Sequence, residues 1–336
     1  MGKRQAEDDT VSNRCGIILA GGDGLRLRPF IRRVRGDALP KQYVNFVGKR
    51  SMLEHTFHRV ERLIPSDRLF TVVSRDHLKH PEVRRQLAGR SKGTVILQPE
   101  NRETGPGLLL PLVHLHARYG DAVVAVFPSD HFVLHEAAFM GQVDIACRAV
   151  ERDPSRVVLL GVEPDRPEPE YGYLLPDGAN GHDVPDGTCP LSGFVEKPGI
   201  DAARDLVLRG GLWNTLVMAF RVNTLLSLVQ EVTPSVYRTF ELIEAAIGTP
   251  SEGEVVEGAY RTMERVNLSH NVLEVLARRR PSPLLVIPVK GVGWSDWGSE
   301  ERIANVLQRN GCVSRSPAPS RVEDVGRGAE RLNPQV

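Results

Sequence analysis

The sequence of 336 residues has few cysteines, no dominant charge and no long apolar run. Its four cysteines stand far apart without a CxxC pair, which excludes a zinc-ribbon pattern and argues against a disulfide framework. The 43 Lys and Arg residues against 42 Asp and Glu residues leave a net charge of +1. Proteins that bind nucleic acid through electrostatics carry a marked basic excess, so we expect no nucleic-acid partner.

The sequence also lacks the marks of a membrane or secreted protein. No apolar run approaches the ~18 residues that a membrane-spanning helix needs. The first 14 residues are charged and have no apolar core of the kind found in signal peptides. We therefore expect a cytoplasmic protein with no membrane partner. A flexible N-terminus is expected over residues 1–13, and a disordered tail over 313–336, where Pro, Ser, Gly and charged residues are frequent.

Between these ends, short apolar runs alternate with amphipathic stretches. The near-continuous apolar runs are typical of strands that are covered on both faces. This alternation predicts the α/β class: a Rossmann-like, open, mostly parallel sheet with helices on both faces. Ser51 and Glu54 have the spacing of a capping box at a helix start. The predicted strands are 15–20, 69–73, 94–97, 122–127 and 157–162, and the predicted helices are 51–63, 107–119 and 136–152.

After about residue 163 the β-like runs become shorter, and Pro and Gly become more frequent. We expect strands at 171–175, 191–195, 216–220 and 284–289, with helices at 200–209 and from Pro234 onward. We interpret residues 14–312 as one domain in two halves, about 14–163 and 164–312, the second with a small β-rich part. Ligands of such sheets lie beyond the carboxyl ends of the strands, so the residues after 20, 97 and 127 are candidates.

A glycine-rich turn with cations behind it follows the first predicted strand. Glycines let the backbone approach a phosphate closely and point its N–H groups at the oxygens. The spacing is not that of a Walker A loop, and Leu27 stands where a dinucleotide fingerprint has its third glycine. From Gly24 to Lys41 there are six Lys or Arg residues and one acid. Each charge contact at ~4 Å is worth ~4 kcal/mol at an effective dielectric near 20, so the pattern predicts a triphosphate cradle rather than a solvated basic turn.

Residues 19–29 (LAGGDGLRLRP), together with Leu39-Pro40-Lys41-Gln42, resemble the signature of sugar-phosphate nucleotidyltransferases. The pair Lys41-Gln42 after Pro40 resembles the mannose-1-phosphate guanylyltransferase (GDP-mannose pyrophosphorylase) branch in particular. The resemblance runs from about Cys15 to Leu307 and implies a fold of the nucleotide-diphospho-sugar transferase type. Residues 98–107 (QPENRETGPG) resemble the family segment that lies along the nucleoside. The implied nucleotide-binding residues are Leu19, Ala20, Gly21, Gly22, Gly24, Gln98, Asn101, Thr104 and Gly105.

Two acidic motifs imply a metal site. Asp130 lies in 127–131 (FPSDH), at the end of the most apolar predicted strand, and Asp296 lies in 293–298 (GWSDWG). A single Asp after a strand is usually a turn former, but carboxylate oxygens are also the ligands that Mg²⁺ prefers. Both segments resemble metal-binding motifs of the family. The resemblance implies that Asp130 and Asp296 bind one Mg²⁺.

Three later motifs resemble the family's sugar-phosphate side: 170–173 (EYGY), 194–198 (FVEKP) and 212–215 (LWNT). They imply that Lys197 meets the sugar phosphate. The residues implied to bind the sugar phosphate are Tyr171, Gly172, Glu196, Lys197 and Asn214. The implied catalytic residues are Arg26, Lys41, Asp130, Lys197 and Asp296.

The expected reaction joins a nucleoside triphosphate and a sugar 1-phosphate into a nucleotide sugar and pyrophosphate, with GTP and mannose 1-phosphate as the first-choice pair. The sequence departs from the family pattern at Leu25, Arg28, Glu103 and Ser269. A non-catalytic or regulatory relative, or the same reaction on another substrate pair, therefore remains an alternative. The family implies a homodimer. Since the sequence ends without the further C-terminal domain of some relatives, one activity is expected.

Overall fold

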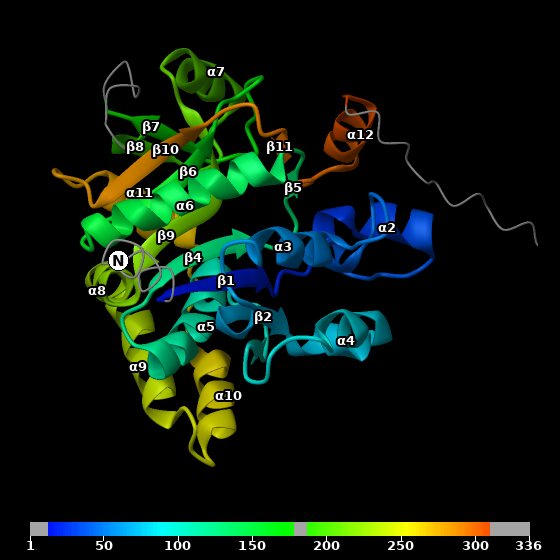
Figure 1. Ribbon diagram of the computed structural model, residues 1–336, viewed down its shortest axis with the longest axis vertical. Coiled ribbons are helices and arrows are strands. Elements are labelled where there is room, and N and C mark those ends of the chain that lie inside the picture. The colour runs from blue at the N-terminus through cyan, green and yellow to red at the C-terminus, as the bar shows by residue number, and fades with distance from the viewer. Residues whose placement is uncertain (1–12, 178–186, 310–336) are drawn as a thin grey trace, which may run out of the picture.

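The structure is a computed structural model that describes residues 13–177 and 187–309 (Figure 1). Within these residues, nine strands form one sheet in the order β3-β2-β1-β4-β9-β6-β10-β8-β7. The predicted tail and all but the last residue of the predicted flexible N-terminus lie outside the described residues. The strands of the sheet are β1 (Arg14–Ala20), β2 (Leu69–Ser74), β3 (Val95–Gln98), β4 (Val123–Pro128), β6 (Val157–Val162), β7 (Tyr173–Pro176), β8 (Cys189–Val195), β9 (Leu212–Arg221) and β10 (Leu284–Val289).

The sheet is mixed, with a parallel portion built from the first half of the chain. β1 pairs in parallel with β2 and β4, and β2 pairs in parallel with β3. β9 lies antiparallel between β4 and β6. β6 and β10 are parallel, and β7 and β8 complete the far edge as antiparallel strands. The β-rich part expected in the second half therefore continues the main sheet.

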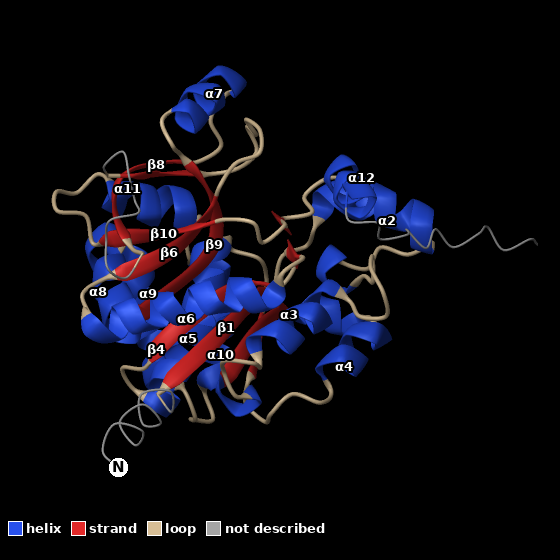
Figure 2. Ribbon diagram, turned by 45° about the horizontal axis from the view of Figure 1, so that its top comes forward, coloured by secondary structure: helices blue, strands red, loops and turns tan. Residues whose placement is uncertain are grey.

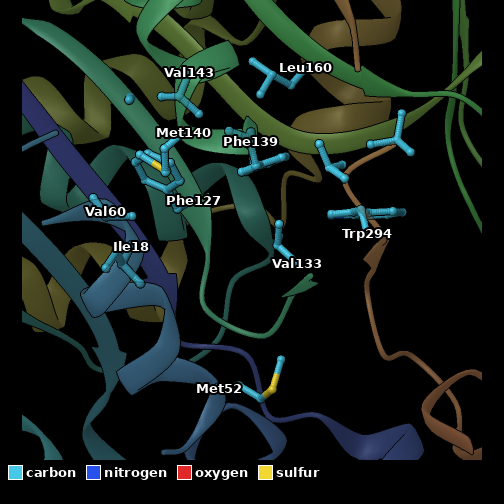
Figure 3. Close-up of a cluster of buried hydrophobic side chains, with 14 of the residues drawn as sticks. Ile18, Met52, Val60, Phe127, Val133, Phe139, Met140, Val143, Leu160 and Trp294 are labelled. Carbon is cyan, nitrogen blue, oxygen red and sulfur yellow. The ribbon is translucent and has the colours of Figure 1, made fainter. Parts of the chain in front are cut away.

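Helices cover both faces of the sheet (Figures 1 and 2). Alternate residues of each strand face opposite cores: in β1, Ile18 joins the core beneath α3 and α6, while Ile17 joins the core beneath α5, α8 and α9. Figure 3 shows the first core, where Phe127, Phe139 and Val60 meet from a strand and two helices. The helices are α2 (Arg28–Arg35), α3 (Met52–Val60), α4 (Pro81–Leu87), α5 (Thr104–Tyr119), α6 (Glu136–Arg152), α7 (Ile200–Leu208), α8 (Val222–Val232), α9 (Pro234–Ala246), α10 (Glu252–Thr262), α11 (Glu274–Ala277) and α12 (Glu300–Arg309).

The start of α3 confirms the predicted capping box. Ser51 Oγ accepts the backbone N–H of Glu54 at 3.1 Å, and Glu54 Oε2 accepts the backbone N–H of Ser51 at 2.7 Å. Two N–H groups that a helix start leaves without an intrahelical partner are thus satisfied. The cap places the apolar stripe of α3 against the sheet, where Leu53 is fully buried.

A two-stranded antiparallel ribbon joins two distant parts of the chain. Its strands are β5 (Phe132–Val133) and β11 (Trp294–Ser295), with Trp294 opposite Val133. Nearby, α2 and α12 lie side by side, and Arg33 of α2 pairs with Glu300 of α12 (Figures 1 and 2). Among the residues described, no helix is long and apolar enough to span a membrane.

Candidate active site

The glycine turn after β1 is held in place by two glutamine side chains. The Gln42 amide donates to the carbonyl oxygens of Ala20 and Gly22, each at 2.8 Å. The Gln98 amide donates to the carbonyl oxygen of Gly21 at 3.1 Å, and a Cβ added to Gly21 would lie 2.3 Å from Gln98 Nε2. A side chain at position 21 would therefore displace the Gln98 amide and break its hydrogen bond to the turn. The hydrogen bonds from Gln42 and Gln98 thus fix the backbone of the turn, including its amide groups.

Gly24 closes the turn in the left-handed region, with φ of 59°. A Cβ at this position would lie 3.3 Å from the Lys41 side chain. A side chain here would thus combine backbone strain with crowding against Lys41. The turn and Lys41 are packed as one unit.

Two cavities flank the turn. The larger, the cradle cavity, has a volume of about 310 Å³, and the smaller, the nucleoside cavity, has about 110 Å³. Between them they are lined by most of the predicted nucleotide-binding residues. The cradle cavity is lined by Gly24, Leu25, Arg26, Leu27, Lys41, Asp130 and Gly298, and the nucleoside cavity by Leu19, Gly21, Gly22, Val72, Gln98, Asn101, Glu103, Thr104 and Gly107.

Lys41 connects the two predicted metal-binding segments. Its ammonium group lies 2.9 Å from Asp130 Oδ2 and donates to the backbone carbonyl of Asp296 at 3.0 Å. Lys41 is mostly buried, with 13% of its side chain exposed. The structure thus brings the end of β4 and the segment after β11 to one cation.

The carboxylate of Asp296 lies in a dense set of donors. It accepts hydrogen bonds from Tyr171 Oη at 2.8 Å, from the Gly298 backbone N–H at 2.9 Å and from Arg302 Nη1 at 3.0 Å. Burial would raise the pKa of Asp296, but the charges of Lys41 and Arg302 and these contacts hold it below its ordinary value. The carboxylate is therefore ionised at neutral pH.

His131, next to Asp130, is a neutral side chain. Burial lowers its pKa to about 4, although Asp130 and Asp296 act in the opposite direction. Its Nδ1 accepts the indole N–H of Trp294 at 3.3 Å, which fixes the ring against β11. Within the described residues, no group of three or more His, Cys, Asp or Glu side chains is arranged to hold a metal ion.

The predicted sugar-phosphate residues meet around Gly172. A Cβ on Gly172 would lie 2.7 Å from Glu196 Oε2 and 3.5 Å from the Cβ of Asn214. The backbone N–H of Asn214 donates to the Gly172 carbonyl at 2.8 Å. Lys197 Nζ donates to Glu196 Oε1 at 2.9 Å, and the Lys197 backbone has a φ of 48°. Non-glycine residues in this region are strained, and such strain clusters at binding sites.

Tyr171 differs in placement from the other residues of this group. It is buried, and its hydroxyl donates to Asp296, so in this structure it supports the carboxylate rather than offering a free donor. Its neighbour Glu170 links two arginines of the site. Glu170 Oε2 accepts from Arg26 Nη1 at 2.9 Å and from Arg302 Nη2 at 2.6 Å.

Only part of the predicted cation cluster reaches the cradle cavity. Arg26 and Lys41 line it, whereas Arg33 pairs with Glu300, and Arg35 pairs with Asp37 and Glu82. Arg33 and Arg35 are thus directed to partners outside the cavity, because successive positions of a helix point in different directions. Arg26 and Lys41, the two cations of this segment that were predicted to be catalytic, are thus among the residues that line the cavity.

Two other predicted positions have structural contacts. Gly105 donates its N–H to the carbonyl of Val266 at 2.8 Å, and Thr104 Oγ1 accepts the N–H of Leu268 at 2.9 Å. Ser269, one of the departures from the family pattern, is buried in the same segment. The segment that contains Ser269 thus packs against the start of α5, beside the nucleoside cavity.

Arg302 is a site residue that the sequence did not single out. It lies on α12 with 6% of its side chain exposed and binds Asp296, Glu168 and Glu170. Its guanidinium also lies 4.6 Å from the centroid of the Tyr171 ring. An arginine on an amphipathic helix normally belongs to the solvated face. Its position six residues after Asp296 is the one signal that points to the site.

The fold and the site together define a class of protein: an α/β protein with a glycine turn at the carboxyl edge of its sheet and with cations and carboxylates beside that turn. Residues 15–309 match the family described as nucleotidyl transferase, and the chain belongs to that family.

The chain is similar to several curated bacterial proteins. It is 27% identical over 299 residues to the xanthan biosynthesis protein XanB of Xanthomonas campestris pv. campestris, a match that covers 88% of this chain and 60% of XanB. It is 30% identical over 288 residues to the alginate biosynthesis protein AlgA of Pseudomonas fluorescens, covering 84% of this chain and 56% of AlgA. It is 27% identical to a mannose-1-phosphate guanylyltransferase of Salmonella montevideo, covering 92% of this chain and 63% of that protein. The chain thus spans about three-fifths of the length of these relatives.

Solved structures support the same fold. The crystal structure named mannose-1-phosphate geranyltransferase of Thermus thermophilus matches with a TM-score of 0.72 and 28% identity, covering 88% of this chain and 79% of that one. A structure named mannose-6-phosphate isomerase of Helicobacter pylori matches with a TM-score of 0.64 at 18% identity, covering 84% of this chain and 99% of that one. The second likeness concerns the fold alone. Both confirm the predicted α/β class.

Proposed function

We propose that the protein transfers a nucleotidyl group from a nucleoside triphosphate to a sugar 1-phosphate, with GTP and mannose 1-phosphate as the preferred pair. One observation carries the proposal: Lys41 contacts Asp130 and the Asp296 backbone at the wall of the cradle cavity. Membership of the nucleotidyl transferase family and the similarity to a mannose-1-phosphate guanylyltransferase support it.

In the proposed reaction, a phosphate oxygen of the sugar 1-phosphate attacks the α-phosphorus of the triphosphate. The new P–O bond forms as the bond to the β-phosphate oxygen breaks, and pyrophosphate leaves with the electron pair. The chain supplies no nucleophile, because positioning and charge neutralisation provide most of the catalysis in such transfers.

The residues on the nucleotide side have separable tasks in this proposal. The backbone amides of the glycine turn bind phosphate oxygens, and Arg26 and Lys41 neutralise the triphosphate. Arg26 would exchange its contact with Glu170 for phosphate, since both side chains are about half exposed and their pair is weak. On the other side, Lys197 would leave Glu196 to orient the attacking phosphate.

The chemistry of the two carboxylates, though not their present contacts, is that of a magnesium site. Mg²⁺ binds through one or two carboxylates and completes its shell with water and substrate phosphates. In this structure each carboxylate already faces a protein cation: Lys41 contacts Asp130, and Arg302 contacts Asp296. Asp130 and Asp296 would hold the ion, which would supply charge neutralisation to the phosphates of both substrates.

A pyrophosphate-release assay with GTP, Mg²⁺ and a panel of sugar 1-phosphates tests the proposal. We expect turnover, highest with mannose 1-phosphate. ATP, UTP, CTP and dTTP serve as matched alternatives for the base. Turnover with another pair would support the proposed reaction type but would show that GTP and mannose 1-phosphate are not the preferred substrates. Silence across the panel, with GTP still bound, would refute the activity and favour a non-catalytic relative.

A further inference from the structure

A cavity of about 690 Å³ lies outside the site described above. It is bounded by the approach to α3, by one face of α3, by β5 and by the first turn of α6. None of its lining residues also lines the cradle cavity or the nucleoside cavity. It therefore has its own lining, although His131 and Trp297 are chain neighbours of Asp130 and Gly298 in the cradle cavity, and we call it the arginine cavity.

The lining of the arginine cavity carries an excess of positive charge. Arg50, Arg59 and Arg62 line it, against one carboxylate, that of Glu136. Glu136 lies 3.5 Å from Arg62 and 3.9 Å from Arg59, so its charge is shared between two guanidinium groups. The rest of the lining includes apolar side chains, among them Val133 and Met52.

Arg59 is the buried member of this set. Its side chain is 3% exposed, and its Nη2 donates to Thr56 Oγ1 at 2.7 Å and to the His131 carbonyl at 3.1 Å. Among the described residues, its Nε has no hydrogen-bond partner. Burial lowers the pKa of Arg59 to about 10, because Glu136 and Asp130 offset the desolvation only in part. A buried guanidinium with incomplete compensation favours an anion.

The N-terminus of α6 faces the same space. α6 is 17 residues long, and its first-turn residues Glu136, Ala137 and Ala138 line the cavity. The N-cap residue, His135, makes no side-chain hydrogen bond to this turn in the described structure. The first N–H groups of a helix have no intrahelical partner and carry its positive dipole end, which favours an anion such as phosphate.

We propose that the arginine cavity is a second phosphate-binding site, which takes a phosphorylated small molecule with its phosphate at Arg59, Arg62 and the start of α6. The apolar side chains of the lining contact the rest of the molecule. The volume is within the range of cavities that hold nucleotide-sized ligands. This proposal does not depend on the proposed reaction.

The test is calorimetric titration of the whole chain with three probes: inorganic phosphate, glucose 6-phosphate and GMP. Each probe is titrated into the unchanged protein, Arg62→Gln and Lys41→Ala. Arg62 is 44% exposed, so its replacement leaves the core intact, and Arg50→Gln provides a second variant. Arg204→Gln on α7 is the control, since Arg204 is 62% exposed and pairs with Asp201 on its own helix.

We expect at least one probe to bind about tenfold more weakly to Arg62→Gln, the effect of losing one partly desolvated charge contact. Its affinity for Lys41→Ala and Arg204→Gln should not change. The probe that binds best separates a bare phosphate from a sugar phosphate or a nucleotide. Binding lost in Lys41→Ala and kept in both cavity variants would place the probe in the cradle cavity and overturn the proposal. Absence of binding for all three probes would also overturn it.

Discussion

Replacing Lys41 with alanine tests the core of the proposed mechanism. The change removes the ammonium group that contacts Asp130 Oδ2 at 2.9 Å and the Asp296 carbonyl at 3.0 Å. A cation at ~4 Å from a phosphate oxygen is worth ~4 kcal/mol at an effective dielectric near 20. Loss of one preorganised donor to developing charge costs about 10²–10³ in kcat. We therefore expect kcat to fall by about 10²–10³, read from single-turnover pyrophosphate release.

Stability should change much less than the rate. The side chains of Lys41 and Asp130 are 13% and 27% exposed, so water screens the charge that remains on Asp130. Because this pair lies between a surface pair and a fully buried one, we expect a loss of about 1–3 kcal/mol in the free energy of unfolding, measured by urea denaturation. A larger loss of stability would mean that the lower kcat of Lys41→Ala reflects unfolded protein rather than a lost catalytic contact.

Arg33→Ala is the matched control, because Arg33 belongs to the same cationic segment. Its guanidinium pairs with Glu300, and the two side chains are 61% and 55% exposed. Such a surface pair is worth about 0–1 kcal/mol, and Arg33 does not line the cradle cavity. The rate of Arg33→Ala should equal that of the unchanged protein. Equal rate losses in the two variants would refute the specific role of Lys41.

Three further changes test other contacts. Asp130→Asn should lower turnover by about 10²–10³ with an unchanged circular dichroism spectrum, and near-normal turnover would contradict its role. Arg302→Leu should destabilise the fold by about 3 kcal/mol at pH 7, because it leaves Asp296 buried with less compensation. The pKa of Asp296 is lower in the folded protein than its unfolded value of about 3.9, so its ionised form stabilises the fold above that value. This stabilisation is lost as the pH falls through the folded pKa. If melting temperatures of Arg302→Leu fell with acid as steeply as those of the unchanged protein, this role of Arg302 would be refuted. Gly105→Ala should lower the melting temperature, since its Cβ would lie 2.7 Å from the Val266 carbonyl oxygen, and an unchanged midpoint would show that the α5 start can shift.

Much of the first half of the fold follows from local pattern. The apolar runs predict β1, β2, β4 and β6 to within one residue at either end, because a strand covered on both faces needs apolar residues at successive positions. The capping box predicts the start of α3, because its two hydrogen bonds involve residues three apart. The glycine turn is likewise predictable from sequence, because its glycines follow directly after the apolar run of β1.

What the sequence could not show depends on pairing between distant segments. Arg302 pairs with Glu170, 132 residues earlier in the chain, and nothing in the pattern of α12 marks Arg302 as buried. Arg33 and Arg35 belong to the same cationic segment as Arg26 and Lys41, but they pair with Glu300 and Glu82 and do not line the cradle cavity. The roles of the predicted site residues remain predictions for the assays above.

The position of β9 has a consequence for synthesis of the chain. β9 supplies the neighbour that both β4 and β6 need, yet it ends at Arg221, about 60 residues after β6. While the ribosome is still translating that interval, the emerging polypeptide holds two hydrophobic strands with open edges and no partner between them. Proteins dominated by such non-local pairings fold slowly and expose aggregation-prone edges. A fragment that stops near residue 163 should therefore be insoluble when expressed alone.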